Sequence, residues 1–262
     1  MSAAGFRLRW LGQSGFLIEY AGSRALLDPY LSDSLTKKYA NTGRPHIRMK
    51  PIVVDPATLT GIEVVTSSHN HTDHLDAETL LPIMRANPEM KLIAPAANRA
   101  FVAERLGCDE GWIIGLEDRE SARVGSFCIS AVPACHEEVA PEYHGYVVQA
   151  GDWTIYHSGD TLLYDGMAER LREFGRIDVA LLPINGRAPE RRVAGNLNAR
   201  EAAQLGRDIG ARTVIPCHYD MFTFNTADPA DFAAAARAIG QPYHIMELGG
   251  WWDSTQLEEA HT

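Results

Sequence analysis

The chain has 262 residues, of which 45% are hydrophobic and 22% are charged. This composition is typical of a globular protein, and the length allows one large α/β domain or two small ones. The formal charge is −10, from 34 Asp and Glu against 24 Lys and Arg. It argues against a general binder of nucleic acid or of anionic membranes, because no surplus of cations exists to neutralise phosphates.

Sequence features that would direct the chain out of the cytoplasm are not evident. No apolar run approaches the roughly 20 residues of a membrane span, and the first ten residues lack the apolar stretch of a signal peptide. The cysteines at 108, 128, 135 and 217 show no Cys-x-x-Cys spacing. Free thiols are typical of a reducing compartment. We expect a cytoplasmic protein with no membrane and no nucleic-acid partner.

The first half of the chain begins with short strands. Alternating apolar residues and glycine turns predict strands over 6–11, 16–20 and 25–27, the last ending at Asp28-Pro29. Residues 32–50 have no clear period, but they form a basic island with Lys37, Lys38, Arg44, His46, Arg48 and Lys50. Beyond it we expect strands over 62–66, 91–94 and 126–132, and helices from Asp76 to before Pro88 and over 96–106.

The second half repeats this style. We expect a hairpin of strands 145–150 and 153–156, strands over 179–182 and 213–215, helices over 167–174, 199–206 and 230–239, and a last short strand around 244–248. Strands begin each half and helices alternate with strands later. This order predicts a single α/β domain over residues 1–262 with two sheets.

The segment His69-Asn-His71-Thr-Asp73-His74 carries the strongest chemical signal. Imidazole nitrogens and a carboxylate suit divalent transition metals, and catalytic sites leave a position open for water. Two histidines two residues apart on a turn can face one ion, while Asp73 and His74 can face a second. Three more candidate ligands follow predicted strands: His136, Asp160 and His218. Loops at one mouth of a sheet would bring these segments together.

Several further segments resemble the metallo-β-lactamase superfamily, and within it the branch that includes L-ascorbate-6-phosphate lactonase. They are Trp10-Leu-Gly-Gln-Ser-Gly-Phe16, Asp55-Pro56 through Asp76, Tyr156-His-Ser-Gly-Asp160, Ile177-Asp-Val-Ala-Leu181, Val214-Ile-Pro-Cys-His-Tyr-Asp220 and Ala227-Asp-Pro229. The resemblance covers nearly the whole chain and implies a four-layer αββα sandwich with metals at one edge of the sheets.

The resemblance also implies a ligand set for two divalent metal ions, zinc or manganese. It assigns His69, His71 and His136 to one ion and Asp73, His74 and His218 to the other, with Asp160 bridging them. A histidine at position 136 departs from the lactonase pattern and is more typical of other superfamily members. This departure favours a complete dinuclear site.

The expected activity is hydrolysis of a small ester or lactone, including a phosphorylated sugar lactone. Two nearby cations lower the pKa of a shared water towards neutrality, which supplies the attacking hydroxide. Asp73 is the candidate that orients this nucleophile and accepts its proton. His144 and Tyr219 are candidate proton donors to the leaving group, although His144 also fits a strand residue hydrogen-bonded to backbone. Arg187 is the candidate for binding an anionic substrate group.

Other functions remain open at this stage. The first alternative is a phosphodiesterase that acts on the same dinuclear centre. A redox di-iron protein is disfavoured, because that branch typically has a carboxylate where His71 stands. A metal-bearing scaffold without turnover is a further alternative. The expected partner is a small molecule, and the resemblance also favours a homo-oligomer.

Overall fold

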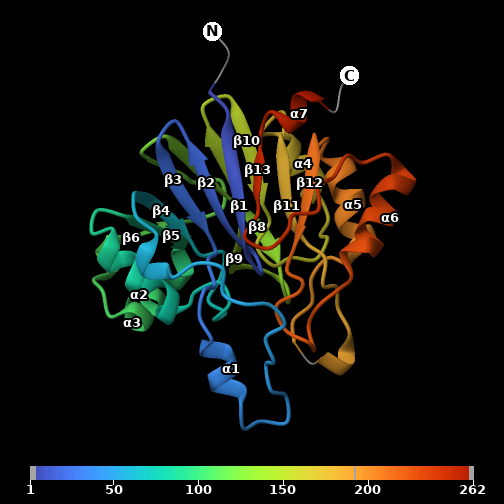
Figure 1. Cartoon of the computed structure of the whole chain (residues 1–262). Helices are drawn as coiled ribbons and strands as arrows, with labels where there is room; N and C mark the ends of the chain where they lie inside the picture. The colour runs from blue at the N-terminus through green and yellow to red at the C-terminus, as the bar shows by residue number, and fades with distance from the viewer. Residues whose placement is uncertain (1–3, 192, 260–262) are drawn as a thin grey trace.

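Two β-sheets lie face to face in the computed structural model, and helices cover their outer faces (Figure 1). The structure describes residues 4–191 and 193–259. The first sheet has seven strands in the order β13-β1-β2-β3-β4-β5-β6, and the second has six in the order β12-β11-β10-β9-β8-β7. The layers confirm the predicted αββα sandwich.

The first sheet changes from antiparallel to parallel pairing at β3. Its strands are β1 (Phe6–Gly12), β2 (Gly15–Tyr20), β3 (Ser23–Leu27), β4 (Ile62–Thr66), β5 (Lys91–Pro95), β6 (Ile113–Leu116) and β13 (Trp251–Asp253). β13, β1, β2 and β3 pair antiparallel, and β3 to β6 pair parallel. Parallel neighbours need crossovers, which α2 (Ala77–Ala86) and α3 (Arg99–Leu106) supply.

The second sheet is arranged in the same way. Its strands are β7 (Ser121–Val124), β8 (Phe127–Cys135), β9 (Val139–Ala150), β10 (Trp153–His157), β11 (Val179–Pro183) and β12 (Thr213–Cys217). β7 to β10 pair antiparallel and β10 to β12 parallel. α4 (Met167–Arg172) and α5 (Ala199–Asp208) form the crossovers between the parallel strands.

The remaining helices are α1 (Ser34–Tyr39), α6 (Pro229–Ile239) and α7 (Gln256–Glu259), with short 3₁₀ turns at Pro56–Thr58, Ala96–Asn98, Glu110–Trp112 and Pro189–Arg191. Helix starts follow their capping residues. Asp76 accepts a hydrogen bond from the Thr79 amide, and Asn198 forms a capping box with Glu201. Over the described residues, none of these helices is both long and apolar enough to cross a bilayer.

Apolar side chains from the inner faces of both sheets form the main core. Phe6 and Phe16 of the first sheet and Phe127 and Tyr146 of the second are all fully buried in it. A smaller core lies between the first sheet and the helices α2 and α3. Burial on both faces makes these strands a rigid support for the loops at their ends.

The expected last strand around 244–248 is wrong. The strand is β13, and residues 244–248 are irregular. A turn at Gly249, where φ is +76°, directs the chain back to β1, and the Trp252 ring lies 5.6 Å from that of Phe6. The segment 32–50 contains α1, and residues 107–125 contain β6 and β7, which the sequence analysis did not predict.

Candidate metal centre

The predicted metal ligands meet at one edge of the sandwich. β4, β8, β10 and β12 all end at this edge, and α1 lies just beyond it (Figure 1). The loop after β4 provides His69, His71, Asp73 and His74, and the ends of β8, β10 and β12 provide His136, Asp160 and His218. The strand order therefore gathers side chains that are up to 149 positions apart, because 218 − 69 = 149.

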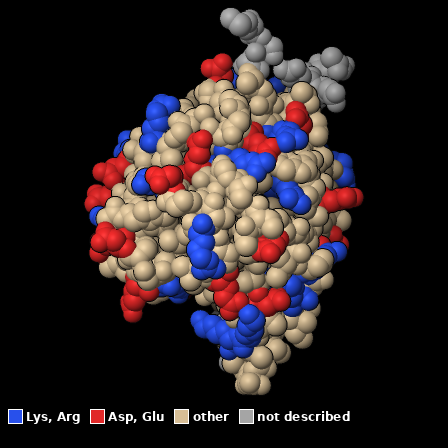
Figure 2. Space-filling view, turned by 60° about the vertical axis from the view of Figure 1, so that its left-hand side comes forward, with Lys and Arg blue, Asp and Glu red and all other residues tan. Residues whose placement is uncertain are grey.

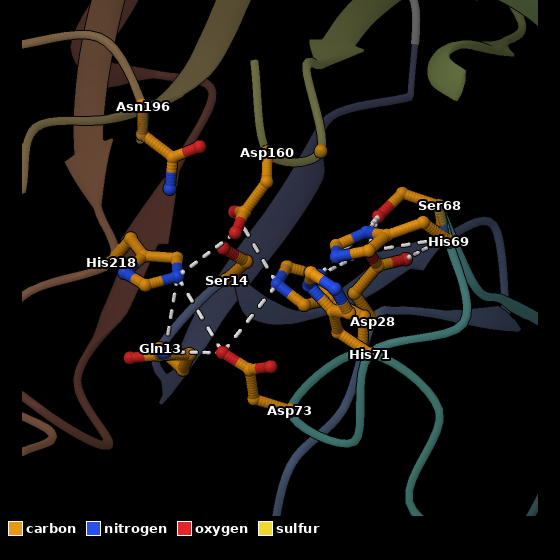
Figure 3. A network of polar contacts seen from close by, with 12 residues as sticks. Gln13, Ser14, Asp28, Ser68, His69, His71, Asp73, Asp160, Asn196 and His218 are labelled. Atoms are coloured by element: carbon orange, nitrogen blue, oxygen red, sulfur yellow. Dashed lines mark hydrogen bonds and ion pairs between the residues drawn. The ribbon is translucent and has the colours of Figure 1, made fainter. Parts of the chain in front are cut away.

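The donor atoms form two groups, within each of which the atoms lie within 4.8 Å of one another. One group is His69, His71 and His136, and the other is Asp73, His74, Asp160 and His218. The Asp160 carboxylate lies between them: Oδ2 is 3.7 Å from His136 Nε2 and 3.2 Å from His218 Nε2. Figure 3 shows Asp160 and Asp73 pointing toward His218 from different loops.

The chemistry of this cluster fits divalent metal ions. His69 Nε2, His74 Nε2 and Asp160 Oδ1 are buried and make no hydrogen bond to the described residues. Buried polar atoms rarely lack a partner, so several such atoms converging on one point indicate a bound ion. A nitrogen and oxygen donor set without thiolates suits zinc, manganese and similar ions.

Hydrogen bonds orient two of the histidines for ligation. His74 Nδ1 lies 2.7 Å from Asp28 Oδ2, and His136 Nδ1 lies 3.2 Å from the Gly195 carbonyl oxygen. An Nδ1–H that donates to oxygen leaves the Nε2 lone pair free for a metal. Both Nε2 atoms face the cluster.

Asp28 is a functional residue that the sequence analysis used only as the end of a strand. Its side chain is fully buried, and it accepts hydrogen bonds from the Ser68 amide, the Ser68 hydroxyl and the Thr66 hydroxyl in addition to His74. Burial opposes ionisation, but the His74 hydrogen bond and the charge of His157 lower the pKa of Asp28 below its ordinary value. Asp28 thus fixes both His74 and the start of the metal loop.

Gln13 is a second residue that the sequence analysis did not assign to the site. It lies on the turn after β1 with a positive φ of 51° and a buried side chain. Its Nε2 donates to Asp73 Oδ2 at 2.7 Å and lies 3.1 Å from His218 Nε2 (Figure 3). Its carbonyl oxygen accepts from the His218 amide at 2.9 Å. This turn of the first sheet therefore positions a ligand of the second.

Gly159 allows the Asp160 loop to approach the metal loop. Its φ is +59°, and a Cβ at this position would lie 2.6 Å from the Ser68 Cβ and 2.7 Å from the His144 carbonyl oxygen. Real Cβ contacts are longer than this, so any side chain would push the loops apart. The close contact between the two sheets therefore requires a glycine at position 159.

Local charges divide the ligands into two types. Burial lowers the pKa of His69 and of His136, which keeps both imidazoles neutral, as metal ligation requires. Burial opposes ionisation of Asp73 and Asp160 as well, but the neighbouring His74 and His218 outweigh it and lower both carboxyl pKa values. Burial also opposes a charge on His74 and His218, but Asp160 and Asp73 outweigh it and raise the pKa of His74, and that of His218 to about 9. The cluster thus combines two neutral histidines with two ionised carboxylates and two histidines that hold a proton, which a bound ion would displace.

A cavity of about 430 Å³ opens over the cluster. Gln13, His71, Asp73, His136, Asp160 and His218 lie on its lining. Its other walls come from α1 and the segment after it, from α3, from Asn70 and Thr72 of the metal loop, from Glu137, and from residues 193–194 and 222–225. Such a volume holds a small molecule, and the lining mixes metal ligands with aromatic and cationic side chains.

The structure does not bring the two candidate proton donors into this cavity. His144 lies within β9 and faces a different hollow, lined in part by Leu116 and Pro141, and burial lowers its pKa to about 4. Tyr219 is buried with its ring 4.8 Å from that of Trp10, and burial raises the pKa of its hydroxyl. We therefore retain neither side chain as a leaving-group acid.

Arg187 also lies outside the cavity lining. It is half exposed and forms two hydrogen bonds with Glu201, at 2.7 and 2.8 Å, which occupy its guanidinium. Arg191 donates to the carbonyl oxygens of Asn185 and Thr226, and Arg192 lies outside the described residues. Within the basic island, Lys38 and His46 are the side chains that line the cavity.

The sandwich and its histidine and aspartate cluster define a protein of the metallo-β-lactamase superfamily, and residues 23–219 match the family model described as the beta-lactamase superfamily domain. More narrowly, the chain belongs to the UPF0173 family of metal-dependent hydrolases. It is 30% identical over 248 residues to the UPF0173 protein of Pyrococcus horikoshii, covering 92% of this chain and 96% of the relative. The predicted superfamily and hydrolase class are thus confirmed, while the lactonase branch stays a prediction.

Solved structures show the same fold in proteins of different chemistry. Igni18, a metallo hydrolase from Ignicoccus hospitalis, has a TM-score of 0.70 at 23% identity, covering 95% of this chain and 98% of that one. CmlA, a diiron β-hydroxylase from Streptomyces venezuelae, has a TM-score of 0.71 at 15% identity, covering 97% of this chain and 54% of its own. The fold alone therefore does not select a reaction.

Proposed function

We propose that the protein hydrolyses a small ester or lactone at a centre of two divalent ions, zinc or manganese. The position of Asp160 carries this proposal. Its carboxylate oxygens lie 3.3 Å from His74 Nε2, 3.2 Å from His218 Nε2 and 3.7 Å from His136 Nε2. A carboxylate placed between two groups of ligands could hold an ion of each group, and paired ions would supply an activated water.

The chain's own residues position the reactants. Divalent ions bound here would lower the pKa of a water molecule and polarise the substrate carbonyl. Asp73 lines the cavity with 18% of its side chain exposed, and Gln13 holds its Oδ2 at 2.7 Å. We assign to Asp73 the orientation of the attacking water and the acceptance of its proton.

Hydrolysis of the ester needs no proton donor other than Asp73. Water adds its oxygen to the carbonyl carbon, the bond from that carbon to the leaving oxygen breaks, and the proton taken by Asp73 passes to that leaving oxygen. The buried positions of His144 and Tyr219 agree with such a shuttle, because neither lines the cavity. A group that gives and takes one proton is a general acid and base in turn.

The test is hydrolysis of a lactone panel, including a phosphorylated sugar lactone, by zinc-loaded and manganese-loaded protein. Turnover that needs metal and is lost in Asp160→Ala with its circular dichroism unchanged supports the proposal. A bis-aryl phosphodiester is assayed in parallel. Cleavage of the phosphodiester without any lactone turnover would assign the centre to phosphodiesters, and full lactone turnover by Asp160→Ala would refute the role of the bridging carboxylate.

A further inference from the structure

Two cations that line the cavity, Lys38 and Arg105, have no carboxylate partner among the described residues. The other cations of the basic island that form ion pairs do not line the cavity: Lys37 pairs with Glu78, Arg48 with Asp33, and Lys50 with Asp220. No described carboxylate lies within 4.0 Å of a nitrogen of Lys38 or Arg105. Figure 2 shows positive side chains gathered on the protruding lower end of the molecule, where α1 lies in Figure 1. In a chain of net charge −10, unpaired cations at a cavity indicate an anionic ligand.

Arg105 is held in place by the metal loop itself. It lies on α3, and its Nη1 donates to the carbonyl oxygens of Asn70 at 2.7 Å and Leu75 at 3.0 Å. Its guanidinium carbon lies 4.4 Å from the centre of the Phe101 ring. The other guanidinium nitrogens make no hydrogen bond to a described residue. A planar cation fixed on one edge, with donors left on the other, is prepared to bind a carboxylate or phosphate.

An aromatic wall forms another part of the lining. The His46 ring stacks on Tyr39 with centroids 4.2 Å apart and an interplanar angle of 16°. Phe224 and Phe222 contact it edge-on, with centroids at 4.5 and 5.1 Å. Burial lowers the pKa of His46, so this wall is uncharged at neutral pH. Aromatic faces and edges of this kind pack against a flat, apolar group.

We propose that the substrate is an anionic ester or lactone with a flat apolar body, whose carboxylate or phosphate binds Arg105 while the body packs on the His46 wall. This inference rests on the proposed function for the reacting group. Lys38, exposed at the cavity, adds attraction for the same charge. The volume of about 430 Å³ admits one such molecule beside the metal ligands.

The kinetic test compares three lactones of one shape: dihydrocoumarin, its 6-carboxylate and its 6-phosphate. We expect kcat/KM of at least one anionic lactone to exceed that of the neutral lactone by about 10-fold or more. The ratio of the two constants is the readout, because any general loss of activity cancels in it. A preference for the phosphate or for the carboxylate identifies the anion.

The variants separate Arg105 from the remaining positive charge. Arg105→Gln should remove most of the preference and leave only the roughly two- to fivefold share that Lys38 supplies, whereas Arg105→Lys should retain more of it. Arg85→Gln, on the exposed face of α2, is the control for loss of one charge. Lys38→Met should reduce the ratio about two- to fivefold, and Lys37→Met, its neighbour on α1 that does not line the cavity, should leave it unchanged. A ratio near 1 in the unaltered protein, or one unaffected by Arg105→Gln, overturns the proposal.

A binding measurement separates this inference from the proposed function. Naphthalene-2-sulfonate and the neutral 2-naphthyl methyl sulfone are titrated into metal-loaded protein by calorimetry. Tighter binding of the sulfonate, weakened by Arg105→Gln and not by Arg85→Gln, supports the anion site even if no lactone is hydrolysed. Equal binding of the two probes overturns the site, even if the neutral lactone is a good substrate.

Discussion

The two sheets supply the candidate metal ligands in different ways. The first sheet supplies His69, His71, Asp73 and His74 from one loop after β4, and a single buried carboxylate, that of Asp28, supports both the start of this loop and His74. The second sheet supplies its ligands from three separate strand ends. Ligands on one loop share their support, whereas ligands on separate loops depend on how closely the sheets approach.

The largest effect is expected for Asp160, whose carboxylate lies between the two ligand groups. Asp160→Asn should reduce kcat/KM by more than about 100-fold and reduce bound metal in both groups, because Oδ2 lies 3.7 Å from His136 of one group and 3.2 Å from His218 of the other. His71→Gln should remove metal mainly from one group. Metal content per chain by atomic absorption distinguishes the two variants, and equal losses in both would contradict a bridging role for Asp160.

The close approach of the sheets predicts the next effect. Gly159→Ala should destabilise the protein by about 2–4 kcal/mol, because it combines a strained positive φ with a clash against Ser68. Gly166→Ala is the matched control, since its φ is +82° but no atom lies within 4 Å of its Cβ position. It should cost about 1–2 kcal/mol. Urea unfolding of both variants isolates the clash, and equal losses would refute it.

Weakening the shared support of the metal loop should have a smaller effect. Asp28→Asn keeps the size of the side chain but replaces one carboxylate oxygen by an NH2 group, which cannot accept the hydrogen bonds that Ser68 and His74 donate. His74 thus loses its carboxylate partner. We expect metal affinity to fall about 10- to 100-fold with the ligands intact. Competition with a chromophoric chelator measures this affinity. Unchanged affinity in a folded variant would show that Asp28 supports the backbone alone.

The smallest effect concerns a contact between the sheets away from the metals. The His144 amide donates to the Ser68 carbonyl oxygen at 3.0 Å, and burial lowers the pKa of its imidazole to about 4 from 6.5. The unfolded state therefore binds this proton more tightly than the folded state does. The free energy of unfolding keeps its full value above about pH 6.5 and decreases as the pH falls towards 4. His144→Gln should remove about 1–2 kcal/mol of this decline. Urea unfolding at pH 7 and 4.5 measures it, and an unchanged decline would exclude His144.

The sequence indicated the candidate ligands, which the structure brings together, better than the residues that support them. Ligation restricts the residue type, so His69, His71 and His74 stand out at their spacing without any knowledge of the fold. Gln13 and Arg105 support the site through contacts with residues that are distant in the sequence. Gln13 and His218, for example, are 205 positions apart. A single glutamine or arginine in a sequence does not indicate which distant residue its side chain will contact.

The same distinction applies to the secondary structure. Long or fully buried elements such as β11 and α6 have apolar patterns that identify them. β6 and β7 have four residues each and lie at sheet edges, and α1 has six, so each spans no more than about two periods, too few to be distinguished from a loop. The position of β13 depends on pairing with β1, a contact that no local pattern encodes.

The pairing of β1 with β13 has a consequence for synthesis of the chain. The Phe6 amide donates to the Ser254 hydroxyl, 248 positions later, so one edge of β1 has no partner until β13 has been synthesised. At ribosomal rates of about 5–20 residues per second, that interval is roughly 12–50 s. An open strand edge can pair with a neighbouring nascent chain on the same messenger. Slow translation would therefore favour exchange of this strand between chains, and rapid translation would favour its pairing within one chain.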